Sequence, residues 1–286
     1  MAVFIGLFGA LTAWMVSAEQ PQAQAKSPEA NVLALGGDIT EIVFALGQGH
    51  RLVARDTTST YPPEARNLTD VGYVRALSPE GVLSVEPELI LAAEGAGPVE
   101  AIEVLREASI DFVTVPQGFD AQAIAEKIRV IGTALDVPER AEDLVFQMMA
   151  GLDAARAQAD AREDAGKRVL FVLSTQGGRI MASGRDTGAA HIIEMAGGVN
   201  AISEFEGYKQ ISEEAVITAA PDVILMMDRG GNHGATPEEL FALPAMAATP
   251  AAETEALVRM NGLLLLGFGP RTPDAIRELS AALAES

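Results

Sequence analysis

A short polar turn, Gly72-Tyr73-Val74-Arg75, presents a phenol and a guanidinium two residues apart. A phenolate oxygen is a hard anionic ligand, but a free tyrosine has a pKa near ~10 and needs nearby positive charge to ionise. Arg75 can supply that charge, and its guanidinium fork also matches a carboxylate. The alternative is a surface turn whose tyrosine ring packs on a loop, and the residue types alone favour that alternative.

The turn precedes a helix and a strand that occur twice in the chain, from Ser78 to Leu91 and from Ser212 to Leu225. In each copy a serine opens a short helix, and a proline separates the helix from an apolar strand. The Gly-Tyr-x-Arg turn has no such counterpart, so we predict that the repeat is scaffold and docking surface and that the turn holds a ligand. The identical pairs are Ser78/Ser212, Glu80/Glu214, Val82/Val216, Pro87/Pro221, Ile90/Ile224 and Leu91/Leu225.

Strand and helix patterns alternate along most of the chain, which predicts parallel sheets with right-handed crossovers. Asp38 is expected to cap a first helix at 39–46. Between about 137 and 164 the sequence is rich in Ala, Gln and charge, and its apolar residues share one helical face, which predicts a single long helix. The expected strands begin at Val32, Leu52, Glu88, Phe112, Arg168, Val223 and Ala256.

These patterns predict an α/β fold of two Rossmann-like lobes with mostly parallel sheets, joined by one long backbone helix. In such sheets ligands bind outside the carboxyl ends of the strands, so the ligand cleft is expected between the lobes. The predicted segments are a signal peptide at 1–25, an N-terminal lobe at 26–137, a linking helix at 138–165 and a C-terminal lobe at 166–286.

The composition excludes several classes of function. With 40 acidic and 20 basic residues and a net charge of −20, the chain lacks the basic stripe that nucleic-acid phosphates require. It has no cysteine, which excludes disulfides, thiolate metal ligands, a cysteine nucleophile and a lipobox anchor. It has none of the motifs G-x-S-x-G, G-x-x-x-x-G-K-[ST] or H-E-x-x-H, and no G-x-G-x-x-G at a strand–helix junction. We therefore expect a binding protein and no enzyme.

The beginning of the chain has the pattern of a secretory signal. The apolar run from Val3 to Val16 is too short to span a bilayer, and Ala23-Gln24-Ala25 is a small-x-small cleavage pattern. No Lys or Arg precedes Lys26, so the usual basic start is absent. We expect cleavage after Ala25 and a periplasmic mature protein; an uncleaved N-terminal anchor is the alternative.

Six motifs spread over nearly the whole mature chain resemble those of periplasmic haem (hemin)-binding proteins of ABC-type haem importers. Those proteins belong to the helical-backbone metal receptor family, together with siderophore- and cobalamin-binding proteins. The pattern G-Y-x-R-x-L-S-x-E-G separates the haem proteins from these relatives. The resembling segments are Ser59–Pro63, Asp70–Gly81, Met181–Ala190, Ala196–Asn200, Gly207–Val216 and Gly267–Pro273.

The resemblance implies that Tyr73 is the axial ligand of ferric haem, and tyrosine ligation is an established class of haem site. It also implies that Arg229 hydrogen-bonds the phenolate and that Arg75 lies near the haem edge, where the two arginines can pair with propionates. A solvated surface position is the alternative for each arginine. Weaker candidates for the cleft are Tyr61, His233, Arg185 and Arg271; hydrogen bonds that fix a loop explain the last two equally well.

Histidine is the commonest haem ligand, so the three histidines compete with Tyr73. His50 follows a helix and is expected to be exposed, and His191 is expected to pack within a helix. His233 lies in a Gly-rich loop beside Arg229 and is a candidate second ligand. Some relatives hold a second haem through a histidine near a segment that here reads Ser174 to Gly178 without histidine, so the sequence leaves open whether one haem or two bind.

The resemblance further implies that Glu80 and Glu214 dock with arginines of an inner-membrane haem permease, which acts with its ATPase. The helix dipole alone also explains an acid in a first turn. Haem would arrive through an outer-membrane receptor pathway, and the binding protein would be a monomer. The alternative function is binding of cobalamin or a ferric siderophore on the same fold, in which case Tyr73 would not ligate haem iron.

Overall fold

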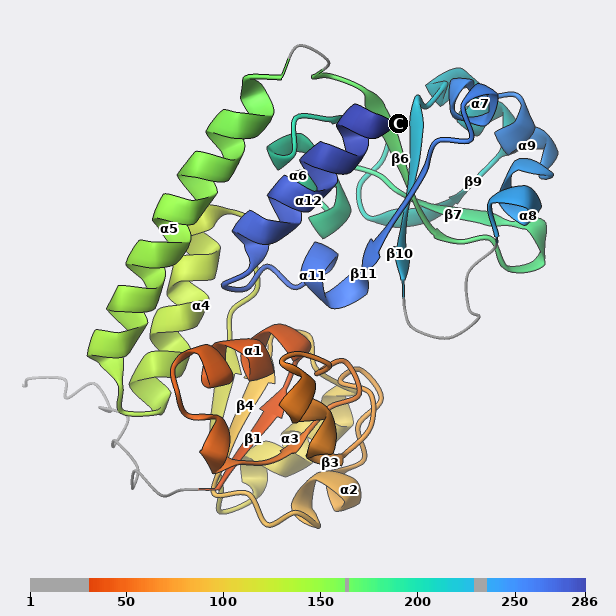
Figure 1. Cartoon of the computed structure of the whole chain (residues 1–286). Helices are drawn as coiled ribbons and strands as arrows, with labels where there is room; N and C mark the ends of the chain where they lie inside the picture. Colours follow the sequence, from red (N-terminus) through yellow and green to blue (C-terminus); the bar gives the residue numbers. More distant parts are fainter. Residues whose placement is uncertain (1–30, 163–164, 229–235) are drawn as a thin grey trace, which may run out of the picture.

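The computed structural model describes residues 31–162, 165–228 and 236–286, which form two α/β lobes joined along one side by a long helix (Figure 1). The predicted signal segment lies outside the described residues. Within the described ranges, no helix combines the length and apolar character needed to cross a membrane.

The N-terminal lobe is built on a five-stranded sheet with the order β3-β2-β1-β4-β5, in which all neighbouring strands are parallel. Both faces of the central strand β1 are packed. Val32 and Ala34 lie in one apolar cluster and Leu33 and Leu35 in another, which explains a continuous apolar strand. The strands are β1 (Val32–Leu35), β2 (Leu52–Arg55), β3 (Thr69–Asp70), β4 (Leu89–Ala93) and β5 (Asp111–Val115).

Helices cover both faces of this sheet (Figure 1). They are α1 (Gly37–Ala45), α2 (Pro79–Leu83), α3 (Val99–Glu107) and α4 (Ala121–Ala134), with short 3-10 turns at Gly49–Arg51 and Pro63–Asn67. The prediction that Asp38 caps the first helix is wrong: α1 begins at Gly37, and its N-cap is Gly36. The Asp38 carboxylate instead pairs with the buried Lys127 of α4.

The long helix is α5 (Pro138–Asp160), whose 23 residues correspond to about 35 Å. It ends a few residues before the predicted boundary. The predicted apolar face is confirmed at Val145, Met148 and Leu152, which are buried. α5 packs against α4 of the N-terminal lobe and against α12 (Thr272–Glu285) of the C-terminal lobe, so one helix contacts both halves of the molecule.

The C-terminal lobe has a six-stranded sheet with the path β11-β10-β6-β7-β9, and β8 pairs with β6. β10 and β11 are parallel to their neighbours, whereas β7 is antiparallel to both β6 and β9. This antiparallel part was not predicted. The strands are β6 (Arg168–Ser174), β7 (Ile180–Ser183), β8 (Val199–Asn200), β9 (Tyr208–Ile211), β10 (Val223–Asp228) and β11 (Leu257–Asn261).

The remaining helices of this lobe are α6 (Gly188–Met195), α7 (Glu213–Ala219), α8 (Pro237–Phe241), α9 (Pro244–Ala247), α10 (Pro250–Glu253) and α11 (Gly262–Leu266), with a 3-10 turn at Gln176–Gly178. The repeated segments adopt the same local structure. Ser78 caps α2 and Ser212 caps α7 through their side chains, and Val82 and Val216 are both fully buried. The predicted helix–strand repeat is therefore a structural repeat.

Candidate functional site

The carboxyl ends of the N-terminal strands face the C-terminal lobe. Gly37, the first residue of α1 after β1, has no room for a side chain: an added Cβ would lie 2.6 Å from the carbonyl oxygen of Thr58 and 2.7 Å from the side chain of Leu263 in α11. Because parallel strands end at one edge of a sheet, the loops after β2 and β3 also lie there. We call this edge, with the loops at 56–61 and 71–77, the interlobe edge.

One ionic contact joins the lobes at this edge. An Arg271 Nη donates to the Glu41 carboxylate of α1 at 2.6 Å, and the Arg271 guanidinium lies 3.4 Å from the centroid of the Tyr61 ring. Burial raises the pKa of Glu41, and the hydrogen bond and charge of Arg271 oppose that shift. Two predicted secondary residues, Tyr61 and Arg271, are thus brought together, and they form an interlobe contact.

A second ionic contact lies deeper. Lys127 is fully buried, and its ammonium group pairs with the Asp38 carboxylate. The same Nζ donates to the backbone oxygens of Phe268 at 3.2 Å and of Gly267 at 3.4 Å, both in the C-terminal lobe. Lys127 therefore connects α4 of one lobe to the segment before α12 in the other.

Aromatic rings complete the contact between the lobes. The ring of Phe119, in the loop after β5, lies 5.4 Å from the His191 ring and 5.1 Å from the Phe268 ring. His191 is half-buried in α6, so the predicted packing role is confirmed, and its partner ring comes from the opposite lobe. His50 is exposed, as expected.

Tyr73 lies on the interlobe edge with 47% of its surface exposed. Its turn is fixed by main-chain hydrogen bonds from the Ala76 N–H to the Tyr73 oxygen at 2.7 Å and from the Gly97 N–H to the Val74 oxygen at 2.9 Å. Arg75 is also exposed. Neither side chain hydrogen-bonds to another described residue, so both are available to a ligand.

A third tyrosine, Tyr208 at the start of β9, faces the same region, and the sequence analysis gave it no role. Burial raises its pKa, whereas hydrogen bonds from the Ala189 N–H and the Thr187 hydroxyl, and the positive charge of Arg75, oppose the shift. The sequence signal that could have indicated Tyr208 is the pair Gly207-Tyr208, which has the same residue types as Gly72-Tyr73. Both glycines have positive φ, 102° at Gly72 and 78° at Gly207.

Gly207-Tyr208 is therefore a partial counterpart of Gly72-Tyr73, one residue out of register with the repeat. Each dipeptide precedes the serine-capped helix of its lobe. The prediction that the turn has no counterpart holds for Arg75 but not for the glycine–tyrosine pair. Two phenols, one from each lobe, are thus candidates to contact a ligand between the lobes.

The other predicted residues divide into three groups. Arg185 pairs with Glu206 at 3.3 Å, and both side chains are exposed, so the loop-fixing alternative describes its contacts. Arg229 and His233 lie outside the described residues. Glu80 and Glu214 are exposed in the first turns of α2 and α7. These two helices lie at the outer ends of the two lobes, on the side away from α5 (Figure 1).

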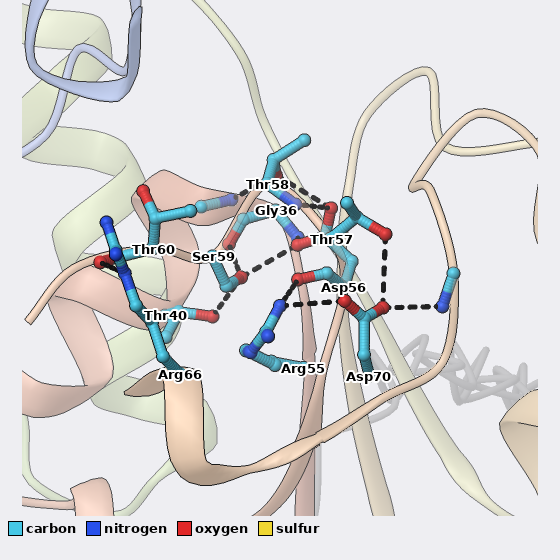
Figure 2. A network of polar contacts seen from close by, with 12 residues as sticks. Gly36, Thr40, Arg55, Asp56, Thr57, Thr58, Ser59, Thr60, Arg66 and Asp70 are labelled. Atoms are coloured by element: carbon cyan, nitrogen blue, oxygen red, sulfur yellow. Dashed lines mark hydrogen bonds and ion pairs between the residues drawn. The ribbon is translucent and has the colours of Figure 1, made fainter. Parts of the chain in front are cut away.

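A polar network anchors the loops of the interlobe edge (Figure 2). Asp56, fully buried, accepts hydrogen bonds from the Gly36 N–H at 3.1 Å, from the Thr58 N–H at 2.9 Å, and from the Thr58 and Ser59 hydroxyls at 2.7 Å each. Ser59 in turn contacts the Thr40 hydroxyl of α1 at 2.6 Å. A charged carboxylate tolerates such burial because four donors satisfy it.

Metal ligation by a cluster of side chains has no support in the described part of the chain, where no group of three or more His, Cys, Asp or Glu side chains is arranged to hold an ion. A ligand that brings its own metal needs only one or two axial donors. The phenol of Tyr73, which is exposed and has no hydrogen-bond partner among the described residues, is a candidate donor of that kind.

In the comparisons with known proteins, the matching family model and the similar solved structures indicate the same class of protein. The family model of periplasmic binding proteins matches residues 32–262. The structure of the periplasmic heme-binding protein BhuT in complex with two hemes is 39% identical, with a TM-score of 0.84 and coverage of 89% of this chain and 97% of that one. The apo structure of the periplasmic heme-binding protein RhuT from Roseiflexus sp. RS-1 is 36% identical, with a TM-score of 0.86 and coverage of 90% and 98%.

A curated relative carries a different ligand in its name. The vitamin B12-binding protein of Pectobacterium atrosepticum is 28% identical over 261 residues, which cover 89% of this chain and 88% of that protein. All three relatives match along nearly their whole length. The predicted two-lobed α/β fold with one long helix is confirmed.

Proposed function

The chain belongs to the periplasmic binding protein family, and from this premise we propose that it captures haem through Tyr73 and delivers it to an inner-membrane ABC permease. Substrate-binding proteins of ABC transporters act with a membrane permease and an ATPase. The observation that carries the choice of haem is the exposed Tyr73 phenol on the interlobe edge, two residues before an exposed Arg75 whose guanidinium pairs with no described residue.

The chemistry of haem fits these two side chains. Ferric iron prefers a hard anionic oxygen, which a tyrosine phenolate provides. The guanidinium of Arg75 can pair with a haem propionate. Because the whole chain is acidic, with a net charge of −20, an anionic ligand needs such local arginines. Arg229 is the second arginine in this proposal.

Cobalamin is the second candidate ligand, because curated relatives with 25–28% identity are named vitamin B12-binding proteins. The solved heme-binding proteins BhuT and RhuT are more similar, at 39% and 36% identity. A phenol beside an unpaired arginine also suits a ferric ligand with carboxylates better than a corrinoid whose cobalt already has its own axial base.

Spectroscopic titration separates the two candidates. We expect equimolar haemin to give a shifted Soret band on addition to the mature protein, and excess cyanocobalamin to leave that shift unchanged. The saturation point also gives the number of haems, which matters because the similar BhuT structure holds two. Binding of cyanocobalamin with displacement of haemin, or no Soret shift at all, would reject haem as the ligand.

For delivery, we propose that the permease contacts both lobes through Glu80 and Glu214. Both carboxylates are exposed, and they occupy the same position of equivalent helices. Their placement at the outer ends of the two lobes suits a partner that spans the molecule (Figure 1). A dipole effect explains each acid alone, but it does not require an exposed acid at the same position of both helices.

Replacing Glu80 and Glu214 together with alanine should reduce haem transport in a reconstituted importer by about tenfold or more, because each loss leaves a partner charge unpaired. Haem affinity in solution should not change. Glu213→Ala is the matched control, since Glu213 is an exposed acid in the same turn of α7. Transport that survives in the double variant, or falls equally in the control, would show that docking uses other residues.

A further inference from the structure

The placement of Tyr73 depends on its main chain, because its side chain has no hydrogen-bond partner among the described residues. The residue that precedes it, Gly72, has φ 102°, a conformation that a residue with a side chain rarely adopts. An added Cβ at Gly72 would meet nothing within 4 Å. Glycine is therefore needed here for its backbone conformation, and something must hold that conformation in place.

Two neighbours hold the Gly72 residue from opposite sides. Its N–H donates to Oδ1 of Asp70 at 2.9 Å. Its carbonyl oxygen accepts from the Thr57 N–H at 2.9 Å. The Thr57 hydroxyl donates to the same Asp70 Oδ1 at 3.1 Å, so the loop after β2 and the turn after β3 are tied through one carboxylate oxygen.

The other oxygen of Asp70 is held by the β2 strand (Figure 2). Arg55 Nη1 donates to Asp70 Oδ2 at 3.0 Å and to the carbonyl oxygen of Asp56 at 2.9 Å. Arg55 and Asp70 are register partners in the parallel pair of β2 and β3. Asp70 is thus fixed at both oxygens, one toward the sheet and one toward Gly72.

This arrangement reaches the buried part of the lobe. The residue after Arg55 is Asp56, whose four hydrogen bonds connect it to Gly36 and to the loop at 58–59. A continuous chain of polar contacts therefore runs from the end of β1, through Asp56, Arg55 and Asp70, to the residue before Tyr73 (Figure 2). A turn held only by local contacts would need just the hydrogen bond from the Gly72 N–H to Asp70, whereas here Asp70 is also bound to Arg55 and Thr57.

We propose that Asp70 is a positioning residue for the ligand phenol: it fixes the Gly72 conformation and so aims Tyr73 between the lobes. This inference rests on the proposed function, because it concerns how Tyr73 meets haem iron. Asp70 contacts no ligand itself. Residues that orient a metal ligand typically change metal affinity by about 10–100-fold when they are lost.

The test compares Asp70→Ala and Asp70→Asn with Asp222→Ala. Asp222 is a matched control: it accepts the Arg168 N–H at 2.7 Å and lies 3.5 Å from the Arg168 Nε. The Asp222 side chain is 37% exposed and that of Asp70 is 39% exposed. Two quantities are measured in each variant, namely haemin affinity with its ferric absorption spectrum, and hydrogen exchange of the 71–77 segment in ligand-free protein.

In Asp70→Ala we expect haemin to bind about 10–100-fold more weakly, with an altered ferric spectrum and faster exchange at 71–77. Asp70→Asn keeps an oxygen acceptor for Gly72 and should recover most of the affinity. Asp222→Ala should change neither readout. Unchanged exchange at 71–77 in Asp70→Ala, or faster exchange with wild-type affinity and spectrum, would overturn this proposal alone. Absence of haemin binding by the wild-type protein would overturn it together with the proposed function.

Discussion

Tyr73→Phe is expected to weaken haemin binding by at least about 100-fold, more than the loss of a residue that only orients a ligand. The substitution removes one oxygen and keeps the ring, so packing of the turn at 72–75 is retained. Without the phenolate, ferric iron loses its protein ligand, and only the porphyrin surface and propionates still bind. The measurement is a haemin titration followed at the Soret band, with thermal unfolding recorded to confirm that the variant is folded.

The chain offers a complete set of controls, because it contains three tyrosines and all of them are described. Tyr61→Phe keeps the ring that stacks on Arg271 and should leave haemin affinity within a few-fold of wild type. Tyr208→Phe tests the phenol of the opposite lobe. Loss of the Soret shift in Tyr208→Phe with retention in Tyr73→Phe would move the axial ligand to the C-terminal lobe. Retention in all three variants would exclude a tyrosine ligand, and His233 would be tested next.

Much of the fold follows from local sequence patterns. The parallel core strands could be predicted because both of their faces are buried, so that runs such as Val32 to Leu35 are apolar at every position. The repeated helices could be predicted because Ser78 and Ser212 are typical N-caps. Tyr73 could be singled out because its turn is unusual in residue type. Each of these signals lies within a few neighbouring residues.

The missed features depend on partners that are distant in sequence. Asp38 has the sequence of a helix cap, but its carboxylate pairs with Lys127, 89 residues away. Arg271 pairs with Glu41, 230 residues away, a contact that the sequence did not indicate. Tyr208 was overlooked because β7 and β9 are short and antiparallel and were not predicted as strands. No local pattern indicates such pairings, because residues this far apart in sequence become neighbours only in the folded chain.

The buried pair of Lys127 and Asp38 leads to the largest predicted effect on stability. Lys127→Met keeps the length and apolar stem of the side chain but leaves the Asp38 carboxylate, 7% exposed, without its cation. Removing one partner of a buried ion pair costs about 3–5 kcal/mol in free energy of unfolding. The variant also loses the hydrogen bonds to the backbone oxygens of Gly267 and Phe268, so contact between the lobes weakens as well. Denaturant unfolding of the wild type and the variant measures the difference.

A double-mutant cycle separates the charge from the packing. Lys127→Met combined with Asp38→Asn removes both charges, and it should recover a large part of the lost stability, because an uncompensated buried carboxylate is the main cost. Arg129→Met is the matched control on the same helix: Arg129 also pairs with a carboxylate of another helix, Glu142 of α5, but these side chains are 39% and 59% exposed. Exposed pairs contribute about 0–1 kcal/mol, so this variant should remain near wild type. Equal losses in Lys127→Met and Arg129→Met would show that burial of the Asp38–Lys127 pair adds nothing to the stability of the protein.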